Sequence, residues 1–292
     1  MNNAARRGVF HGKMPILRLR RPQLLVASLA CLTVVGGCSD LGGILAPLPR
    51  PTAASHPGFD TSIYPGDAAM RTWRAASPYE WAGYYLAAPC HADATWSGRR
   101  ATLAAQGWGT AVVYVGQQTW ESLPVAPFAG GPARAVQAAT CSRTLLSGAQ
   151  GTIDAIDAIA KTANEGFPRG STIFLDIEYM STLTAAMREY YRSWIAQLLA
   201  DGRYLPGVYC HRSNAAAIHD DVVAEFMAQR HVESPRFWIA GGSGFSIDRA
   251  PADVGHTFAN VWQGRLDTNE TWGGVPLHID VDVADRSSPS GS

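Results

Sequence analysis

Carboxylates at the ends of short apolar runs constrain the fold of this 292-residue chain more than any other feature. Phe174-Leu175-Asp176-Ile177-Glu178 carries two of them, and Gly58-Phe59-Asp60 and His278-Ile279-Asp280-Val281-Asp282 repeat the placement. Each run is typical of a buried strand, where an ionised carboxylate is costly. Because the chain repeats this placement three times, we expect an acidic pocket at the ends of strands, where a (β/α)8 barrel places its functional residues.

Eight apolar runs alternate along the chain with helix-length segments, which favours an α/β fold built on a parallel sheet. The expected strands are residues 57–63, 81–87, 110–115, 172–178, 204–210, 236–240, 260–263 and 277–283. Helices are expected over residues 97–106, 152–164 and 183–200 and after Ser213. Eight strands predict a closed (β/α)8 TIM barrel, irregular after strands six and seven, where the helices look degenerate.

A long loop follows the third strand. Residues 116–148 are irregular and rich in Gly, Pro and Ala. Loops of this length are usually functional or mobile, so this one could narrow or cover a site. The helix after it is expected to bury the face that carries Ile153, Ile156 and Ala160.

Residues 20–38 have the composition of a secretory signal, with a basic start and an apolar stretch of about a dozen residues that is too short for an ordinary membrane helix. Val35-Gly36-Gly37-Cys38 ends this stretch and resembles a bacterial lipobox, in which the Cys becomes the lipidated N-terminus. We therefore expect a lipoprotein-type signal peptide over residues 1–37, with Met14 as an alternative start, and lipidation at Cys38. A simple secretory signal cleaved near Gly37 is the other interpretation.

The rest of the chain divides into three parts. Residues 38–56 are expected to be a flexible Pro/Ala-rich tether, residues 57–285 the barrel, and residues 286–292 a disordered, Ser-rich tail. With a lipid anchor at Cys38, the barrel would be an exported domain attached to a membrane of the bacterial cell envelope, in the periplasm, at the outer membrane or on the cell surface.

Three cysteines, Cys90, Cys141 and Cys210, lie in the expected domain. In an exported protein two of them can form a disulfide. Cys90 and Cys141 are the candidate pair because both fall just after predicted strands or in the long loops that follow, where they could meet on one face. The sequence leaves open whether they do.

Composition excludes some classes of partner. Lys and Arg number 24, Asp and Glu also 24, and no basic patch is interleaved with aromatic residues, so we expect no nucleic-acid partner. His91, His211 and His278 are scattered without ligand-like spacing and no Cys-x-x-Cys occurs, so neither a metal nor a cofactor is expected. We expect a monomer. The Trp and Tyr content suits sugar rings, but it also suits a core.

The carboxylates are expected to share one site. Asp176 and Glu178 lie two residues apart, so strand alternation places both side chains inside the barrel near its top. Asp60 ends strand one, and Asp280 and Asp282 repeat the spacing on strand eight, its neighbour in a closed barrel. Crowded acids raise one another's pKa, which keeps one protonated at neutral pH. A proton donor beside an ionised acid is what cleavage of a glycosidic bond needs. Capping of loop amides or pairing with Arg is the alternative role for any one of them.

These motifs, in this order, resemble the barrel of GH25 lysozymes (muramidases) and, more closely, the glycoside-hydrolase-like DUF1906 (Rv2525c-like) family of exported bacterial proteins. The matching segments are Gly58-Phe59-Asp60, Asp154-Ala155, Gly166-Phe167-Pro168-x-Gly170, Asp176-x-Glu178, Pro206-Gly207-Val208-Tyr209, Trp238-Ile239-Ala240, Trp262-Gln263 and Asp280. The resemblance covers residues 57–285 and implies a TIM barrel.

The resemblance also implies a role for each acid. Glu178 matches the general acid and Asp176 the assisting carboxylate, which stabilises an oxazolinium-like intermediate formed by the substrate's acetamido group or otherwise acts as a base. Asp60 and Asp280 would shape the site and tune Glu178. The family has Asp-x-Asn on its last strand, so Asp282 stands where an Asn is usual. Six strand-end residues are candidate substrate contacts: Tyr114, Tyr209, Trp238, Trp262, Gln263 and Asp282.

The function expected from these features is hydrolysis of a cell-envelope glycan, with peptidoglycan the first candidate because the anchor would hold the domain next to the wall. Two alternatives stay open. One is a non-catalytic lipoprotein that binds peptidoglycan or another glycan on a hydrolase-like barrel, and the other is a hydrolase of a different exported polysaccharide.

Overall fold

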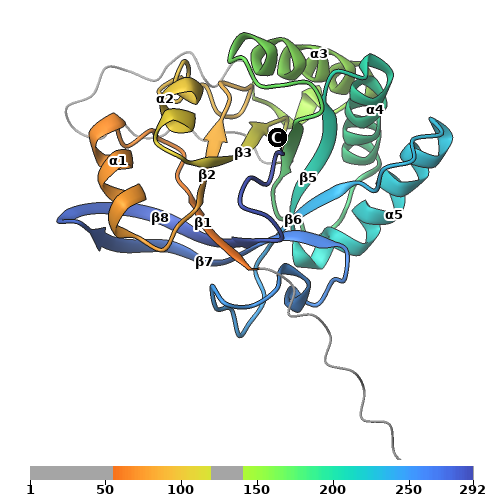
Figure 1. Cartoon of the computed structure of the whole chain (residues 1–292). Coiled ribbons are helices and arrows are strands. Elements are labelled where there is room, and N and C mark those ends of the chain that lie inside the picture. Colours follow the sequence, from red (N-terminus) through yellow and green to blue (C-terminus); the bar gives the residue numbers. More distant parts are fainter. Residues whose placement is uncertain (1–54, 120–140, 292) are drawn as a thin grey trace, which may run out of the picture. The chain divides into compact units, whose positions relative to one another are not determined.

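The computed structural model describes residues 55–119 and 141–291, and its eight strands close into one barrel in chain order (Figure 1). The predicted closed α/β barrel is confirmed. Its strands are β1 (His56–Asp60), β2 (Trp81–Tyr85), β3 (Gly109–Val115), β4 (Thr172–Ile177), β5 (Leu205–His211), β6 (Arg236–Ala240), β7 (Ala259–Trp272) and β8 (Val275–Ala284).

The last strand runs against the others. The pairs from β1–β2 to β6–β7 are parallel, but β8 pairs antiparallel with both β7 and β1. β7 and β8 form a hairpin that turns at Gly273-Gly274, with Trp272 opposite Val275. Both glycines have positive φ, 58° and 80°, which a two-residue hairpin turn requires. The expectation of a fully parallel sheet is therefore wrong at β8, and β7 extends well beyond the predicted residues 260–263.

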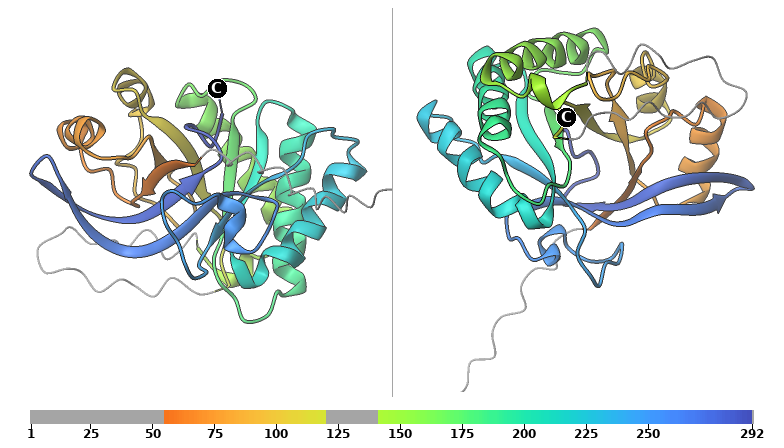
Figure 2. Two further views of the ribbon diagram at one scale, coloured as in Figure 1. Left: turned by 60° about the horizontal axis from the view of Figure 1, so that its bottom comes forward. Right: turned by 180° about the vertical axis from the view of Figure 1, so that it is seen from behind.

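Helices cover the outside of the barrel along β1 to β6 (Figure 2). Only the short 3-10 helix η3 (Pro251–Val254) lies between β6 and β7, as the irregularity expected there indicates. A further 3-10 helix, η2 (Arg143–Leu145), precedes α3. The α-helices of the described residues are α1 (Asp67–Ala76), α2 (Arg100–Ala105), α3 (Gly148–Asn164), α4 (Ala185–Asp201) and α5 (Arg212–Ala228).

Helix α1 is not among the helices expected from the sequence. It packs against the β7–β8 hairpin, where Trp73 Nε1 donates a hydrogen bond to the Val275 carbonyl oxygen at 2.9 Å. Trp73 is fully buried against Phe59 of β1, with ring centroids 5.2 Å apart. A regular barrel would have a helix between its last two strands. Here β7 and β8 are joined by a turn, and α1 packs against the hairpin instead.

Helix α3 turns a different face inward from the one expected. Ile153 and Ile156 are 57% and 54% exposed, whereas Ala155 and Ala158 are fully buried. The small residues face α4 because the two helices approach closely: a Cβ added at Gly151 would lie 2.1 Å from the Tyr190 carbonyl oxygen. The prediction that the face of Ile153, Ile156 and Ala160 is buried is wrong, because all three are exposed and small residues pack where α3 approaches α4 most closely.

The C-terminal segment is ordered as far as residue 291, so the expected disordered tail is wrong for residues 286–291. Ser290 is 1% exposed, and its carbonyl oxygen accepts from Thr172 N–H at 2.7 Å. Its hydroxyl accepts from Val112 N–H at 2.7 Å. The tail therefore satisfies backbone amides of β3 and β4 at the end of the barrel opposite the carboxylates.

Some predictions fall on residues that the structure does not describe. The signal peptide, Cys38 and the tether up to residue 54 lie outside the described residues, as do residues 120–140 of the long loop. Within residues 55–119 and 141–291, no helix has the length and apolar character needed to cross a membrane.

Candidate active site

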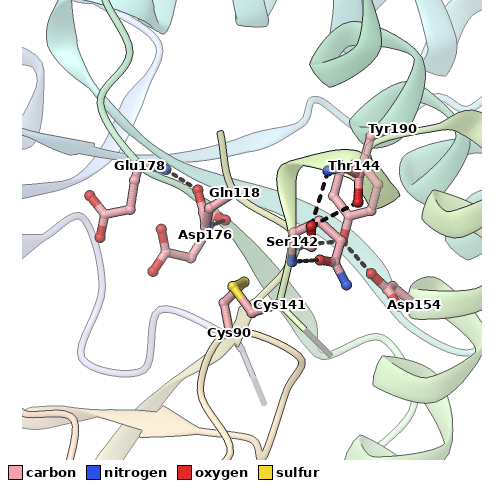
Figure 3. The surroundings of a disulfide bond; sticks show 10 residues. Cys90, Gln118, Cys141, Ser142, Thr144, Asp154, Asp176, Glu178 and Tyr190 are labelled. Atoms are coloured by element: carbon pink, nitrogen blue, oxygen red, sulfur yellow. Dashed lines mark hydrogen bonds between the residues drawn. A yellow bond between two sulfur atoms is a disulfide. The ribbon is translucent and has the colours of Figure 1, made fainter. Parts of the chain in front are cut away.

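Five carboxylates lie toward one end of the barrel, on or just after β1, β4 and β8: Asp60, Asp176, Glu178, Asp280 and Asp282. Asp60 ends β1 and pairs with Asp280 across the antiparallel β1–β8 ladder, so the reversed strand still brings its acid to this end. Figure 3 shows the carboxylates of Asp176 and Glu178 pointing to the same side. The structure thus brings together the acids that the sequence singles out.

Gln263 and two tyrosines hold the Asp60 carboxylate in place. Gln263 Nε2 donates to Asp60 Oδ2 at 2.7 Å and to Asp280 Oδ2 at 3.2 Å. Tyr209 donates to Gln263 Oε1 at 2.7 Å, which fixes the orientation of the amide. Tyr85 donates to Asp60 Oδ1 at 2.6 Å. Each of these donors is neutral, so the carboxylates are oriented without being neutralised.

Asp282 lies one layer deeper, opposite Gly58 of β1, and has no exposed surface. Its Oδ1 accepts from Trp238 Nε1 at 2.9 Å. Burial, followed by the charges of Asp60 and Asp280, holds the pKa of Asp282 well above its usual range. A protonated Asp282 then donates to Asp60, as the carboxamide of an Asn would.

An aromatic layer closes the barrel beneath the acids. The rings of Trp81, Phe174 and Tyr209 meet Trp238 edge to face, with centroids 5.6, 5.8 and 5.5 Å away. Gly58 makes room for this layer, because a Cβ there would lie 2.1 Å from the Trp81 ring. The apolar rings of this layer contribute to the burial of the carboxylates above it, and burial disfavours their charged forms.

Desolvation and mutual repulsion shift the acids toward their protonated forms. Burial, and next the charge of Asp280, raises the pKa of Asp60 to about 7. Burial, then the charges of Glu178 and Asp60, raises the pKa of Asp176 well above its usual range. Burial also raises the pKa of Glu178, and the Asp280 charge adds to this while the Tyr179 N–H opposes it. Glu178 and Asp280 are the partly exposed acids, and Glu178, next to the buried Asp176, can both hold a proton and reach a ligand.

In the part of the chain that the structure describes, none of the five acids forms a salt bridge with Lys, Arg or His. Pairing with Arg, one of the two alternative structural roles, is therefore not observed there. The other, capping of a loop amide, is observed at Asp280, whose Oδ1 accepts from Asp267 N–H at 2.7 Å. Nor do residues 55–119 and 141–291 contain a group of three or more His, Cys, Asp or Glu placed to hold a metal ion. The arrangement suits proton transfer by carboxylic acids.

Comparison with known families agrees with this chemistry. The model of a family described as "Rv2525c-like, glycoside hydrolase-like domain" matches residues 71–284. The chain belongs to this family. A search of curated proteins finds no match.

Solved structures resemble the Rv2525c-like chain in fold. An uncharacterized protein from B. stearothermophilus is 18% identical, with 79% of this chain and 96% of that chain covered and a TM-score of 0.52. The Tat-secreted protein Rv2525c from Mycobacterium tuberculosis is 16% identical, with 79% and 94% covered and a TM-score of 0.45. A GH25 lysozyme from Aspergillus fumigatus is 12% identical, with 79% and 94% covered and a TM-score of 0.44.

Several predicted substrate contacts of the Rv2525c-like domain serve other purposes. Tyr114 is fully buried on the outer face of β3, where its hydroxyl donates to Asp157 of α3 at 2.9 Å. Trp262 is also fully buried, and its Nε1 donates to the Gly241 carbonyl oxygen at 2.7 Å. Both point away from the acids, so their prediction as sugar contacts is wrong. The reason is that the apolar strands of a barrel covered on both faces do not reveal which face is the inner one.

The other predicted contacts face the acids but are already engaged. Trp238 is 1% exposed within the aromatic layer and donates to Asp282, and Gln263 is 2% exposed with both ends of its amide bonded. Tyr209 is only partly buried, but its hydroxyl is directed to Gln263. In this structure they orient the carboxylates, and a direct contact with sugar stays a prediction only for Tyr209.

Two features of the site escaped the sequence analysis. Tyr85 ends β2 and bonds Asp60, while Gly83 leaves space for that acid, since a Cβ there would lie 2.6 Å from Asp60 Cβ. Strand alternation from Gly83 to Tyr85 could have revealed both. Gln118, which contacts the backbone at Asp176 and Glu178, follows β3 in an irregular segment without any pattern that could have identified it.

The structure joins Cys90 to Cys141, the candidate pair, with Cα atoms 4.8 Å apart (Figure 3). Cys90 N–H donates to the Val115 carbonyl oxygen at 3.2 Å, and Val115 pairs with Asp176 of β4. The disulfide therefore anchors the end of the long loop to the strand beside the acids. Cys210 is a buried free thiol.

Removal of this disulfide is expected to destabilise the protein. The bond spans a sequence separation of 51 residues, and the loss of such a constraint on the unfolded chain costs roughly 2–4 kcal/mol. Denaturant unfolding of a Cys90→Ser, Cys141→Ser double variant should show this loss. Dithiothreitol should lower the stability of the wild type toward that of the variant and leave the variant unchanged; equal stability of both proteins without reductant would contradict the expectation.

Proposed function

We propose that the protein is a glycoside hydrolase of the cell envelope, and that its substrate is peptidoglycan, cleaved at the β-1,4 bond between N-acetylmuramic acid and N-acetylglucosamine. The observation that carries the proposal is the placement of Glu178, a partly exposed carboxyl with a raised pKa, next to the buried Asp176. The description of the family as glycoside hydrolase-like supports the reaction class.

In the proposed reaction Glu178 is the general acid. Its proton passes to the glycosidic oxygen as the bond from that oxygen to the anomeric carbon breaks, and the leaving sugar departs as an alcohol. The positive charge that develops on the sugar ring lies beside Asp176. In one route Asp176 orients the substrate's acetamido group, whose oxygen bonds to the anomeric carbon, and a water then opens the oxazolinium-like intermediate and gives its proton to Glu178. In the other route Asp176 takes a proton from a water as the water oxygen bonds to the anomeric carbon.

The remaining acids have supporting parts in this proposal. Burial raises the pKa of Glu178, and the charge of Asp280 raises it further, which favours the protonated form that a general acid needs. Burial, then the charges of Glu178 and Asp60, raise the pKa of Asp176, which makes its ionised form a stronger base. Gln263 fixes Asp60 and Asp280 relative to each other. The choice of peptidoglycan rests on the lipobox-like Val35-Gly36-Gly37-Cys38, because a lipid-anchored and tethered domain would be held next to the cell wall.

The direct test is digestion of purified peptidoglycan with the soluble domain, residues 55–292, followed by mass spectrometry of the released material. Muropeptides that carry a new reducing end on N-acetylmuramic acid would support a muramidase. Saturable binding to the wall without release would instead favour a glycan-binding protein. If the domain neither binds nor releases wall material, the same assay with other exported polysaccharides tests for a hydrolase of a different glycan.

The pH profile of kcat/KM should report the protonation of Glu178. A general acid works only while protonated, so activity is expected to fall as pH rises through the pKa of Glu178, which is raised above its usual range. Asp280→Asn removes a charge that raises this pKa, so the alkaline limb should move to lower pH. Asp220→Asn, at a carboxylate whose side chain is 86% exposed on α5, should leave the limb in place. A limb that stays in place in Asp280→Asn would argue against this coupling.

A further inference from the structure

The side chain of Gln118 bridges the backbone on both sides of Ile177. Its Nε2 donates to the Asp176 carbonyl oxygen at 2.9 Å, and its Oε1 accepts from Glu178 N–H at 3.1 Å. Figure 3 shows this amide against the end of β4, beside the two acids. Gln118 is 1% exposed, so neither bond competes with bulk water.

The Gln118 side chain binds β4 at the point where β4 no longer has β3 as a hydrogen-bonding partner. The β3–β4 ladder ends with the pairing of Val115 and Asp176, because the chain leaves the sheet after β3. Ile177 still pairs with Cys210 of β5 on the other side. A carboxamide carries one donor group and one acceptor, as a peptide unit does. The Gln118 side chain therefore makes the two hydrogen bonds to β4 that the backbone of β3 would make if that strand continued.

The segment before the bridge is itself fixed from two directions. Gln117 N–H donates to the Tyr190 hydroxyl of α4 at 3.0 Å, and Gln117 Oε1 accepts from Ser142 N–H at 2.9 Å. Ser142 directly follows Cys141 of the disulfide. The residue before Gln118 is therefore bonded both to helix α4 and to the residue that follows the disulfide, which fixes the backbone from which the Gln118 side chain extends.

We propose that Gln118 is a positioning residue of the proposed hydrolase: its carboxamide fixes the end of β4 and so sets where the Glu178 carboxyl lies relative to Asp176. The inference rests on the proposed function for its effect on catalysis. The backbone at Glu178 needs such a restraint because it lies just outside the sheet: Glu178 follows the last residue of β4 and precedes Tyr179, which is 57% exposed. The two bonds from Gln118 restrain the backbone at this transition from strand to loop.

Gln118→Met is the main test, because Met has a similar length and removes both hydrogen-bonding groups. We expect kcat on peptidoglycan to fall about 10- to 100-fold, with KM changed by less than about 3-fold, as for a misplaced catalytic group. Gln106→Met is the matched control: it removes a hydrogen bond of 3.0 Å from the carboxamide Nε2 to the Asp67 carbonyl oxygen, away from the acids and from the segment that holds Gln118. Equal kcat values for the two variants would overturn the proposal.

Gln118→Glu keeps the test decisive if the Met variant does not fold. Its carboxylate can still accept from Glu178 N–H, but it can donate to the Asp176 carbonyl oxygen only when protonated. The activity of this variant relative to wild type should therefore rise as pH falls. A ratio that does not change with pH, with kcat close to wild type, would overturn the role of the donor.

Amide hydrogen exchange separates this inference from the proposed function. The Glu178 amide should exchange about tenfold faster or more in Gln118→Met than in wild type, whether or not the protein cleaves a glycan. Its exchange should be unchanged in Gln106→Met. If wild type releases nothing, the proposed function fails while faster exchange still supports the positioning of Glu178. Unchanged exchange and an unchanged NMR titration of the Glu178 carboxyl in Gln118→Met would overturn the positioning role itself.

Discussion

Glu178→Gln is expected to reduce the turnover of peptidoglycan by about 10²- to 10⁴-fold, the contribution typical of a general acid. The amide has the size of the protonated carboxyl and keeps its hydrogen-bonding groups, but it cannot release a proton to the glycosidic oxygen. Because burial already favours the neutral form of Glu178, a neutral amide should fit without disturbing the fold. The measurement is kcat and KM for release of reducing ends, together with denaturant unfolding.

Glu233→Gln is the matched control for this experiment. Glu233 is exposed and lies near Arg236 and Ser290, at the end of the barrel opposite the acids, so the same chemical change there should leave kcat unaltered. Normal wall binding by Glu178→Gln, with turnover lost, would place the effect in the chemical step. Turnover equal to wild type would remove Glu178 from the acid role and leave Asp176 as the candidate.

The closed barrel could be predicted because its signals are local. Eight apolar runs with helix-length spacers predict the strands from β1 to β6 within a few residues, and each run carries its own boundaries. The reversal of β8 had a local signal too, in Gly273-Gly274 between two strands. The alternation of strands with helix-length segments elsewhere in the chain predicts a parallel sheet, and this pattern hid the signal of the turn. The ordered tail had no such signal, since its partners are backbone amides far away in the sequence.

The acids of the site could be predicted for the same reason, and their supports could not. Asp176 and Glu178 reveal their shared face through a spacing of two residues. Tyr114 lies in the run Ala111-Val112-Val113-Tyr114-Val115, which is apolar on both faces and therefore gives no direction. Gln118 acts through bonds to residues 58 and 60 positions away. Contacts of this kind depend on how strands meet in the barrel, which only the three-dimensional structure shows.

Asp282→Asn is expected to stabilise the protein, and the gain should grow with pH. Asp282 is fully buried, and its Oδ2 has no hydrogen-bond donor within the described residues, as an ionised oxygen would need. A proton on that oxygen lets it donate to Asp60, and the pKa of Asp282 is accordingly raised well above its usual range. An Asn side chain supplies an N–H donor at this position without taking up a proton. It is also the residue usual at this place in the family that the sequence resembles.

The sign of the effect follows from proton binding. In the unfolded chain an Asp titrates near pH 4, so above that pH the folded protein binds about one more proton than the unfolded chain. The stability that this proton gives is complete below that pH and is lost as pH rises toward the folded pKa, at about 1.4 kcal/mol per pH unit. The advantage of Asp282→Asn over wild type should therefore be smallest near pH 4 and increase at that slope.

Urea unfolding of both proteins between pH 5 and pH 8 measures this difference in the free energy of unfolding, with Asp220→Asn as a control whose difference from wild type stays constant. A constant or shrinking difference for Asp282→Asn would mean that Asp282 is ionised in the folded protein, and that Asp60 is held by Gln263 and Tyr85 alone.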